Sequence, residues 1–140
     1  MKWKLDDSRP IWPQLKEQLT MAIVSGRYET GAPFPTVRDL AAEAGVNRNT
    51  MQRALSELES DGLLITNRTS GRTVTSDMEL ISQMKLNAAG AYVDAFMTQM
   101  NASGFTTEEI IQVLEERKDK NETQDKDKDK DKDKEAPKNE

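Results

Sequence analysis

The chain has 140 residues and a net charge of −5, is 32% charged and 35% hydrophobic, and contains neither cysteine nor histidine. Without these residue types it lacks disulfides, thiolate metal ligands and the commonest general base, which argues against a hydrolase-type enzyme and predicts no metal or cofactor. No apolar run approaches the roughly 20 residues of a membrane span and no signal-peptide stretch is present in MKWKLDDSRP, so the sequence predicts a cytoplasmic protein without a membrane segment.

An amphipathic helix is the first predicted element. The stretch PIWPQLKEQLTMAIVSG places apolar residues at helical spacing, and Gly26 then stops the helix. The apolar residues are Ile11, Leu15, Leu19, Ala22 and Ile23. The next segment, RYETGAPFPT, is rich in glycine and proline and is predicted to be a connecting loop.

Two further helices follow this loop. Thr36 and Asp39 form a variant of the capping box, which starts a helix that runs to about Ala44. The turn AGVN comes next, and Asn47 caps a third helix over residues 48–61. Two helices joined by a short turn that contains glycine form a helix-turn-helix.

A β-hairpin is predicted directly after the third helix. Gly62 ends that helix, and two short β-type runs, LLIT and RTVT, are separated by NRTSG, whose composition suits a hairpin turn. A hairpin in this position is the wing of a winged helix-turn-helix.

The second half of the chain is predicted to contain two more helices and a charged tail. Residues 77–101 form a long helical stretch, and Thr106 with Glu109 makes a capping box for a helix over residues 107–118. The terminal run DKDKDKDKDK has no apolar residue, which predicts disorder over residues 119–140. We interpret this tail as solvated chain rather than an autoinhibitory acidic arm, because its Lys and Asp residues balance.

The third predicted helix has two different sides. Met51, Ala54, Leu55 and Leu58 recur at the spacing of one apolar face and are predicted to join the core. The other side carries donors for phosphate oxygens and base edges, and in helix-turn-helix proteins the start of the second helix meets the bases in the major groove. These donors are Arg48, Asn49, Thr50, Gln52 and Arg53.

Arginines of the first half are expected to cluster on one side of the domain. Residues 1–76 hold ten Lys and Arg and nine Asp and Glu, whereas residues 77–140 hold ten and sixteen, so the acidity lies in the second half. Local field decides whether a polyanion binds, and phosphate neutralisation by such a cluster makes affinity fall steeply with salt. The cluster is Arg38, Arg48, Arg53, Arg68 and Arg72.

A known family shows the same combination of motifs. The stretch GAPFPTVRDLAAEAGVNRNTMQRALSELESDGLLITNRTSGRTV resembles the GntR-type bacterial winged-helix domain, and the likeness covers roughly residues 9–76. Members typically combine a proline-serine/threonine-x-arginine helix start, an RNT recognition helix, L-x-x-L-x-x-x-G-L and a glycine-bearing wing. Many also have a second wing glycine and an aromatic residue where this chain has Thr69 and Thr73.

The resemblance implies roles for particular residues. It implies that Arg38, Arg48, Thr50 and Arg53 contact operator DNA, and that Gly71 lets the wing backbone enter the minor groove. Together with the residues argued above, the predicted DNA-binding set is Thr36, Arg38, Asn47, Arg48, Asn49, Thr50, Gln52, Arg53, Arg68, Gly71 and Arg72.

The short helical second half resembles the YtrA subfamily, which implies that it serves for dimerisation. The sequence supports this independently, because apolar and small residues repeat with spacing 3, 4, 3, 4, as a helix-pairing seam requires. The predicted seam is Ile81, Met84, Ala88, Ala91 and Ala95. A second stripe, Tyr92, Phe96 and Met100, is interpreted as core rather than as an aromatic ligand pocket. A small-molecule effector is left open between the subunits of a dimer, and no sequence feature supports one.

The predicted fold class is mainly α with a small β-hairpin. A winged helix-turn-helix domain spans residues 1–76, a two-helix dimerisation appendage spans residues 77–118, and a disordered tail spans residues 119–140. The predicted function is that of a bacterial transcriptional repressor that binds a palindromic double-stranded DNA operator as a homodimer. The subfamily resemblance implies control of a transporter operon. The alternative is a winged-helix protein-interaction module, which requires an exposed apolar patch on the third helix.

Overall fold

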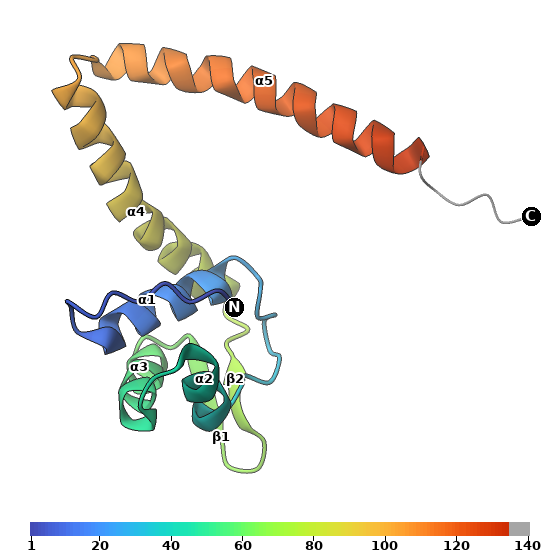
Figure 1. The fold of residues 1–140 in the computed structure, drawn as a ribbon. Coiled ribbons are helices and arrows are strands. Elements are labelled where there is room, and N and C mark those ends of the chain that lie inside the picture. Colours follow the sequence, from blue (N-terminus) through green and yellow to red (C-terminus); the bar gives the residue numbers. More distant parts are fainter. Residues whose placement is uncertain (135–140) are drawn as a thin grey trace, which may run out of the picture. The chain divides into compact units, whose positions relative to one another are not determined.

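The structure is a computed structural model that describes residues 1–134. Its chain divides into two compact units, Met1–Tyr92 (unit 1) and the described residues from Val93 onward (unit 2). The elements in chain order are α1 (Ile11–Val24), α2 (Val37–Ala44), α3 (Arg48–Ser60), β1 (Leu64–Asn67), β2 (Gly71–Val74), α4 (Met78–Ala102) and α5 (Thr107–Lys134) (Figure 1). The predicted fold class, helical with one small hairpin, is confirmed.

The predicted helix starts in unit 1 are present. The backbone N–H of Asp39 donates to Thr36 Oγ1 at 3.1 Å, and that of Asn49 donates to Asn47 Oδ1 at 2.7 Å. These side chains satisfy backbone donors that have no partner within the helix. Gly45 ends α2 in the left-handed conformation, with φ of 69°, which favours glycine. The helix-turn-helix is therefore defined by its caps.

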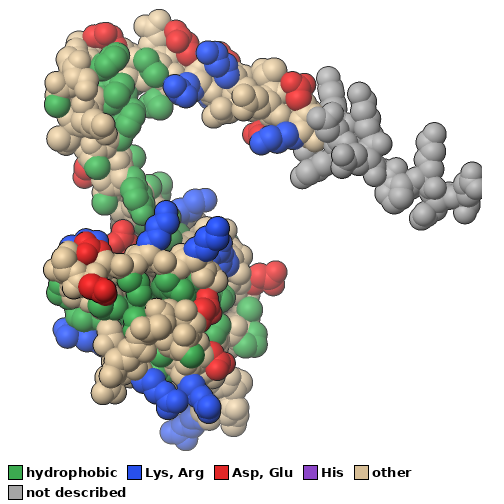
Figure 2. Space-filling view, in the orientation of Figure 1, with side chains coloured by type: hydrophobic (Ala, Val, Ile, Leu, Met, Phe, Trp, Pro, Cys, Tyr) green, Lys and Arg blue, Asp and Glu red, His purple; other side chains and the backbone are tan. Residues whose placement is uncertain are grey.

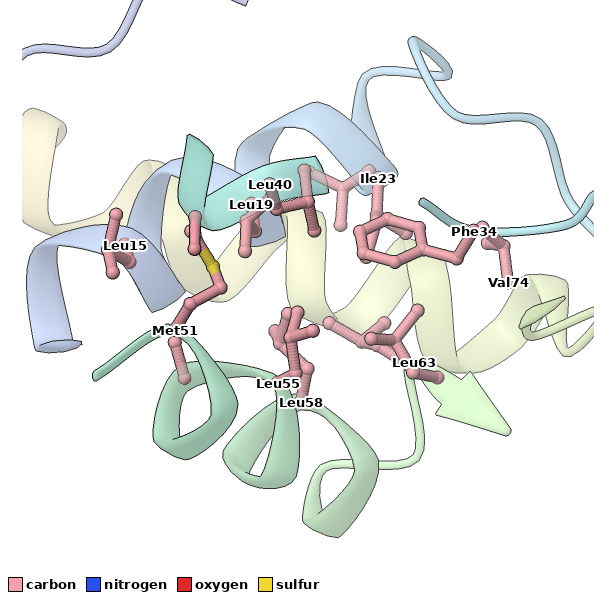
Figure 3. Packing of buried hydrophobic residues seen from close by; sticks show 14 of the residues in the cluster. Leu15, Leu19, Ile23, Phe34, Leu40, Met51, Leu55, Leu58, Leu63 and Val74 are labelled. Atoms are coloured by element: carbon pink, nitrogen blue, oxygen red, sulfur yellow. The ribbon is translucent and has the colours of Figure 1, made fainter. Parts of the chain in front are cut away.

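One hydrophobic core holds unit 1 together. Figure 3 shows Leu15, Leu19 and Ile23 pointing from α1 toward side chains of the other elements. The residues they meet include Leu40 of α2, Met51, Leu55 and Leu58 of α3, Leu63, and Val74 of β2. The apolar sides predicted for α1 and α3 are therefore the sides that pack.

The wing has a third strand-like segment that the sequence pattern does not reveal. β1 and β2 pair antiparallel, with Thr66 opposite Arg72. The loop before α2 adds to the other edge of β2, because Gly31 N–H donates to Val74 O at 2.9 Å, Val74 N–H to Ala32 O at 2.9 Å, and Phe34 N–H to Arg72 O at 2.8 Å. The sequence predicts only a connecting loop here, because prolines and a glycine are not typical of a strand. The hairpin is consequently supported at its base.

The N-terminal segment is also ordered by contacts that sequence periodicity does not show. Gln18 of α1 accepts from Lys4 N–H at 3.0 Å and donates to Lys4 O at 2.7 Å. Gln14 is buried and pairs in the same way with the backbone of Asp6, at 2.8 Å in each direction. Two glutamines one turn apart thus hold an extended segment along α1.

The first turns of α4 belong to unit 1. Ile81 is 6% exposed and lies within its core cluster, and Leu80 and Met84 pack against that cluster. We predicted that the winged-helix domain ends at residue 76, whereas the compact unit reaches Tyr92, inside α4. The reason is that an apolar stripe on α4 is buried by its own chain.

Unit 2 contains the end of α4, a turn and α5. The predicted capping box is present, with Glu109 N–H donating to Thr106 Oγ1 at 3.2 Å and Thr106 N–H to Glu109 Oε1 at 3.3 Å. Ile110 is buried, whereas Val93, Phe96, Phe105, Ile111 and Leu114 are exposed. These five apolar side chains are therefore not buried within unit 2.

α5 is longer than predicted. We expected it to end near Lys118 and a disordered tail to follow, but the helix runs to Lys134. The lack of apolar residues in the tail predicts absence of packing, which differs from absence of helix. No glycine or proline interrupts residues 107–134. Residues 135–140, which the predicted tail also includes, lie outside the described residues.

Candidate DNA-binding surface

α3 presents a polar face opposite a fully buried one. Met51, Ala54, Leu55 and Leu58 are all 0% exposed. On the other side Arg48, Asn49, Gln52 and Arg53 are exposed, and Thr50 is partly buried. Because the buried face packs mainly against α1 and α2, it fixes the direction in which the polar face points. A helix held in this way can offer its first turns to a DNA groove without rearranging.

Two members of the predicted set act as helix caps. The side chains of Thr36 and Asn47 accept backbone hydrogen bonds at the starts of α2 and α3. Both residues are exposed, and each lies where the helix dipole presents its positive end. Both side chains therefore stabilise the start of a helix, and a phosphate contact from either position would be a second role.

A cleft separates the start of α2 from the wing. The cleft is open to solvent and has a volume of about 430 Å³.

 The cleft between α2 and the wing is lined by Phe34, Pro35, Thr36, Val37, Arg38, Thr66, Ser70, Gly71 and Arg72. Four of these residues belong to the predicted DNA-binding set, so the fold brings the start of α2 and the wing together around one groove.

Cationic side chains gather at this end of unit 1. Figure 2 shows Lys and Arg side chains at its lower end, where Figure 1 draws α2, α3 and the hairpin turn. Arg38, Arg48 and Arg68 are exposed, and none of them forms an ion pair with a residue whose side chain the structure describes. Their charge is therefore available to an anionic partner.

Arg53 has an aromatic neighbour. Its guanidinium carbon lies 4.2 Å from the centroid of the Trp12 ring, so the two side chains form a cation–π pair between α3 and α1. Trp12 is partly buried, whereas Arg53 is exposed. The ring limits the rotamers of Arg53 while its charge stays accessible, and this contact was not foreseen from the sequence.

Arg72 is placed differently from the other predicted arginines. Its Nε forms an ion pair and hydrogen bond with Glu59 Oε1, and the same carboxylate oxygen accepts from Thr66 Oγ1 at 2.8 Å. Burial raises the pKa of Glu59, but the hydrogen bonds from Arg72 and Thr66 and the Arg72 charge outweigh it, so the pKa lies below its ordinary value. Glu59 is not in the predicted DNA-binding set.

The sequence did contain a signal for this contact. Thr66 and Arg72 face one another across the predicted hairpin, and Glu59 lies in the last turn of the preceding helix. A hairpin that folds back beside its helix brings a carboxylate near that pair. Sequence periodicity does not reveal this contact, because the contact depends on how the hairpin folds back beside α3.

The predicted dimerisation residues are divided by the structure. Ile81 is buried in the core cluster, and Met84 packs against that cluster and is partly buried. Ala88 is partly buried, and Ala91 and Ala95 are exposed. A 3, 4 spacing identifies an apolar stripe without identifying what covers it, so the seam stays a prediction. Within the described residues, no group of three or more acidic side chains is arranged to hold a metal ion.

Comparison with known proteins places this architecture in a family. Residues 13–74 match the family described as "Bacterial regulatory proteins, gntR family". The HTH-type transcriptional regulator YhcF of Bacillus subtilis is 30% identical over 109 residues, which cover 78% of this chain and 90% of YhcF. The chain belongs to the gntR family. This confirms the family predicted from the motifs, and it makes the protein a DNA-binding transcriptional regulator.

Further relatives of this gntR-family regulator agree with that assignment. The HTH-type transcriptional repressor YtrA of Bacillus subtilis is 33% identical over 70 residues, which cover 50% of this chain and 54% of YtrA. A solved structure of a GntR family transcriptional regulator from Listeria monocytogenes is 35% identical, with a TM-score of 0.71, and the match covers 80% of this chain and 98% of that one. The similarity therefore extends beyond the winged helix, and the relatives include the protein for which the predicted subfamily is named.

In the described chain, no helix of this gntR-family regulator has both the length and the apolar character needed to cross a membrane.

Proposed function

We propose that this gntR-family regulator is a repressor that binds a palindromic operator as a homodimer. The observation that carries the proposal is the contrast within α3, where a 0% exposed apolar side backs an exposed row of Arg48, Asn49 and Gln52. Arginine pairs with guanine, and asparagine or glutamine with adenine, through two hydrogen bonds in the major groove. These three residues are the proposed base readers.

The remaining contacts are proposed to go to phosphates. Arg38 and Arg68 lie exposed at the start of α2 and in the wing turn, and Arg53 projects from beside Trp12. Thr36, Asn47 and Thr50 lie near helix starts, where backbone N–H groups favour anions. Gly71 has φ of 76°, which suits a turn close to a DNA backbone.

Dimerisation is supported by the apolar surface of unit 2. Val93, Phe96, Phe105, Ile111 and Leu114 are between 37% and 53% exposed. A second copy of the chain would bury such a surface, and exposed Ala91 and Ala95 on α4 would allow close approach of a helix. Two-fold symmetry of the dimer then requires two related half-sites.

Repression is proposed because YtrA, one of the relatives, is a repressor. Control of a transporter operon follows from the subfamily resemblance, and the operator would place the site of action in the bacterial cytoplasm. The interaction-module alternative needs an apolar patch on the outer side of α3, and the exposed residues there are polar. No observation favours a small-molecule effector.

The experiment begins with selection of preferred duplexes from a random-sequence DNA pool by the full chain. We expect a palindromic consensus and an affinity that falls steeply with salt. Arg48→Ala should weaken binding to the selected duplex by about 1 to 3 kcal/mol and relax the preference at one position of each half-site. Lys85→Ala, which removes an exposed positive charge from α4, is the matched control and should leave affinity unchanged. Failure to enrich any sequence would contradict the proposal.

A further inference from the structure

One carboxylate joins the wing to the recognition helix. Glu59 lies in the last turn of α3, and its Oε1 accepts from Thr66 on β1 and from Arg72 on β2. Thr66 and Arg72 are directly opposite one another in the hairpin. We call Glu59, Thr66 and Arg72 the wing latch, because this contact ties both strands to α3.

The latch lies where backbone support of the wing ends. The strand-like segment before α2 bonds to β2 at Val74 and, last of all, at Arg72 through Phe34 N–H. From Asn67 to Gly71 the hairpin has no further strand beside it in the described chain. A two-stranded hairpin is marginally stable alone, so contacts at the base decide how firmly the tip is held.

The charges of the latch neutralise one another. The Arg72 and Glu59 side chains are 19% and 30% exposed, so both are largely removed from water. Removing one member of such a pair leaves the charge of the other without a partner. This costs more folding free energy than the loss of an exposed pair does. The Arg72 charge is therefore occupied, in contrast to that of Arg68, which is exposed in the wing turn and unpaired among the described side chains.

We propose that Glu59 and Arg72 are positioning residues that hold the wing beside α3, and that Arg68, not Arg72, supplies the wing's cationic contact to DNA. The inference rests on the proposed function for its DNA part, and its structural part stands without DNA. Under this proposal Arg72 leaves the predicted DNA-binding set. Glu59 becomes a residue that affects DNA binding indirectly, by holding the wing in place.

The salt dependence of binding separates positioning from contact. A residue that neutralises a phosphate contributes about 1 to the slope of log affinity against log salt. We expect Arg68→Ala to lower the slope by about 1, whereas Arg72→Ala and Glu59→Ala should both weaken binding to the selected duplex and leave the slope unchanged. The double variant should bind no more weakly than either single variant. If Arg72 contacts DNA, Arg72→Ala lowers the slope and Glu59→Ala, which frees the arginine, leaves binding equal or tighter; that outcome overturns the proposal.

Charge reversal gives a second test, whose result is the restoration of binding rather than its loss. Arg72→Glu alone should weaken operator binding at least tenfold, and adding Glu59→Arg should restore most of that loss by re-forming an ion pair. If position 72 faces a phosphate, a glutamate there repels DNA whether or not its partner is reversed. A reversed pair that folds, by circular dichroism and thermal midpoint, yet binds as weakly as Arg72→Glu overturns the proposal.

Amide hydrogen exchange of the free protein tests the latch without DNA. Exchange at residues 64–74 should quicken roughly fivefold in Glu59→Ala and Arg72→Ala, with the amides of α1 and α3 unchanged. Arg68→Ala is the matched control and should exchange as the wild type does. Unchanged exchange in the latch variants contradicts the proposal. If the wild type selects no DNA sequence, the proposed function fails while this measurement still decides the latch.

Discussion

The recognition helix and the wing, the two regions proposed to face DNA, are held in place by different means. α3 is fixed by four fully buried apolar side chains, whereas the hairpin is fixed by backbone bonds at its base and by one carboxylate. Burial of apolar side chains is non-directional, so α3 should keep its position when its exposed residues are substituted. The polar contact between the wing and α3 is lost when either partner is removed. Substitutions on the outer side of α3 should therefore change DNA recognition, and substitutions in the wing should also change how well the wing itself is ordered.

The largest expected effect comes from the core side of α3. Leu55→Ala removes a 0% exposed side chain and should lower the free energy of unfolding by about 2 to 5 kcal/mol. Ile65→Ala in β1, where the side chain is 48% exposed, should lower it by less than about 1 kcal/mol. Urea denaturation measures both. Similar losses would mean that the wing is as much a part of the core as the helix is.

The cap of α3 provides a smaller effect that distinguishes folding from binding. Asn47→Ala should lower the free energy of unfolding by about 1 kcal/mol, because Asn49 N–H loses its acceptor. Asn47→Asp keeps the acceptor and suits the helix dipole, yet places a negative charge beside the proposed phosphate contacts. We expect it to retain thermal stability and to weaken DNA binding. Equal DNA affinity of Asn47→Asp and wild type would place position 47 away from the phosphates.

The stacking of Arg53 on Trp12 should contribute less. Trp12→Leu removes the aromatic face and should weaken operator binding by about 0.5 to 1 kcal/mol, and Trp12→Phe by less. The loss should disappear in an Arg53→Ala background, which a double-mutant cycle of binding free energies would show. Equal losses in both backgrounds would mean that Trp12 acts on binding by a route other than Arg53.

The smallest expected effect is a pH dependence confined to the wing. The pKa of Glu59 lies below its ordinary value of 4.5, so the stabilisation from its ionised form is present above that value and is lost as the pH falls through the lowered pKa of the folded state. Wing amide resonances should therefore shift during acidification below about pH 4.5. Glu59→Gln should abolish this transition. A transition that persists in that variant would have to arise from another carboxylate.

Local structure could be predicted well from the sequence, and tertiary contacts less well. Thr36, Asn47 and Thr106 were identifiable as caps because their partners lie two or three residues away. The strand-like segment before α2 and the burial of Ile81 were not, because their partners lie far away in the sequence. The same spacing on α4 fits a dimer seam and an internal core, and only the fold decides between them.

The candidate site shows the same division. The exposed side of α3 could be predicted from the helical positions left over by its apolar stripe. The pairing of Arg72 with Glu59, and of Arg53 with Trp12, could not, because a count of arginines does not reveal which charges are already engaged.

The strand-like segment before α2 has a consequence for where the chain tolerates added residues. Loops between helices ordinarily accept insertions, since few contacts depend on their exact length. Between Gly31 and Phe34, however, three backbone hydrogen bonds set the register of the segment against β2. An inserted residue there would shift that register and disturb the wing. Insertions for labelling or fusion belong instead among the exposed residues 25–27, which follow α1 and lie outside the segment that pairs with β2.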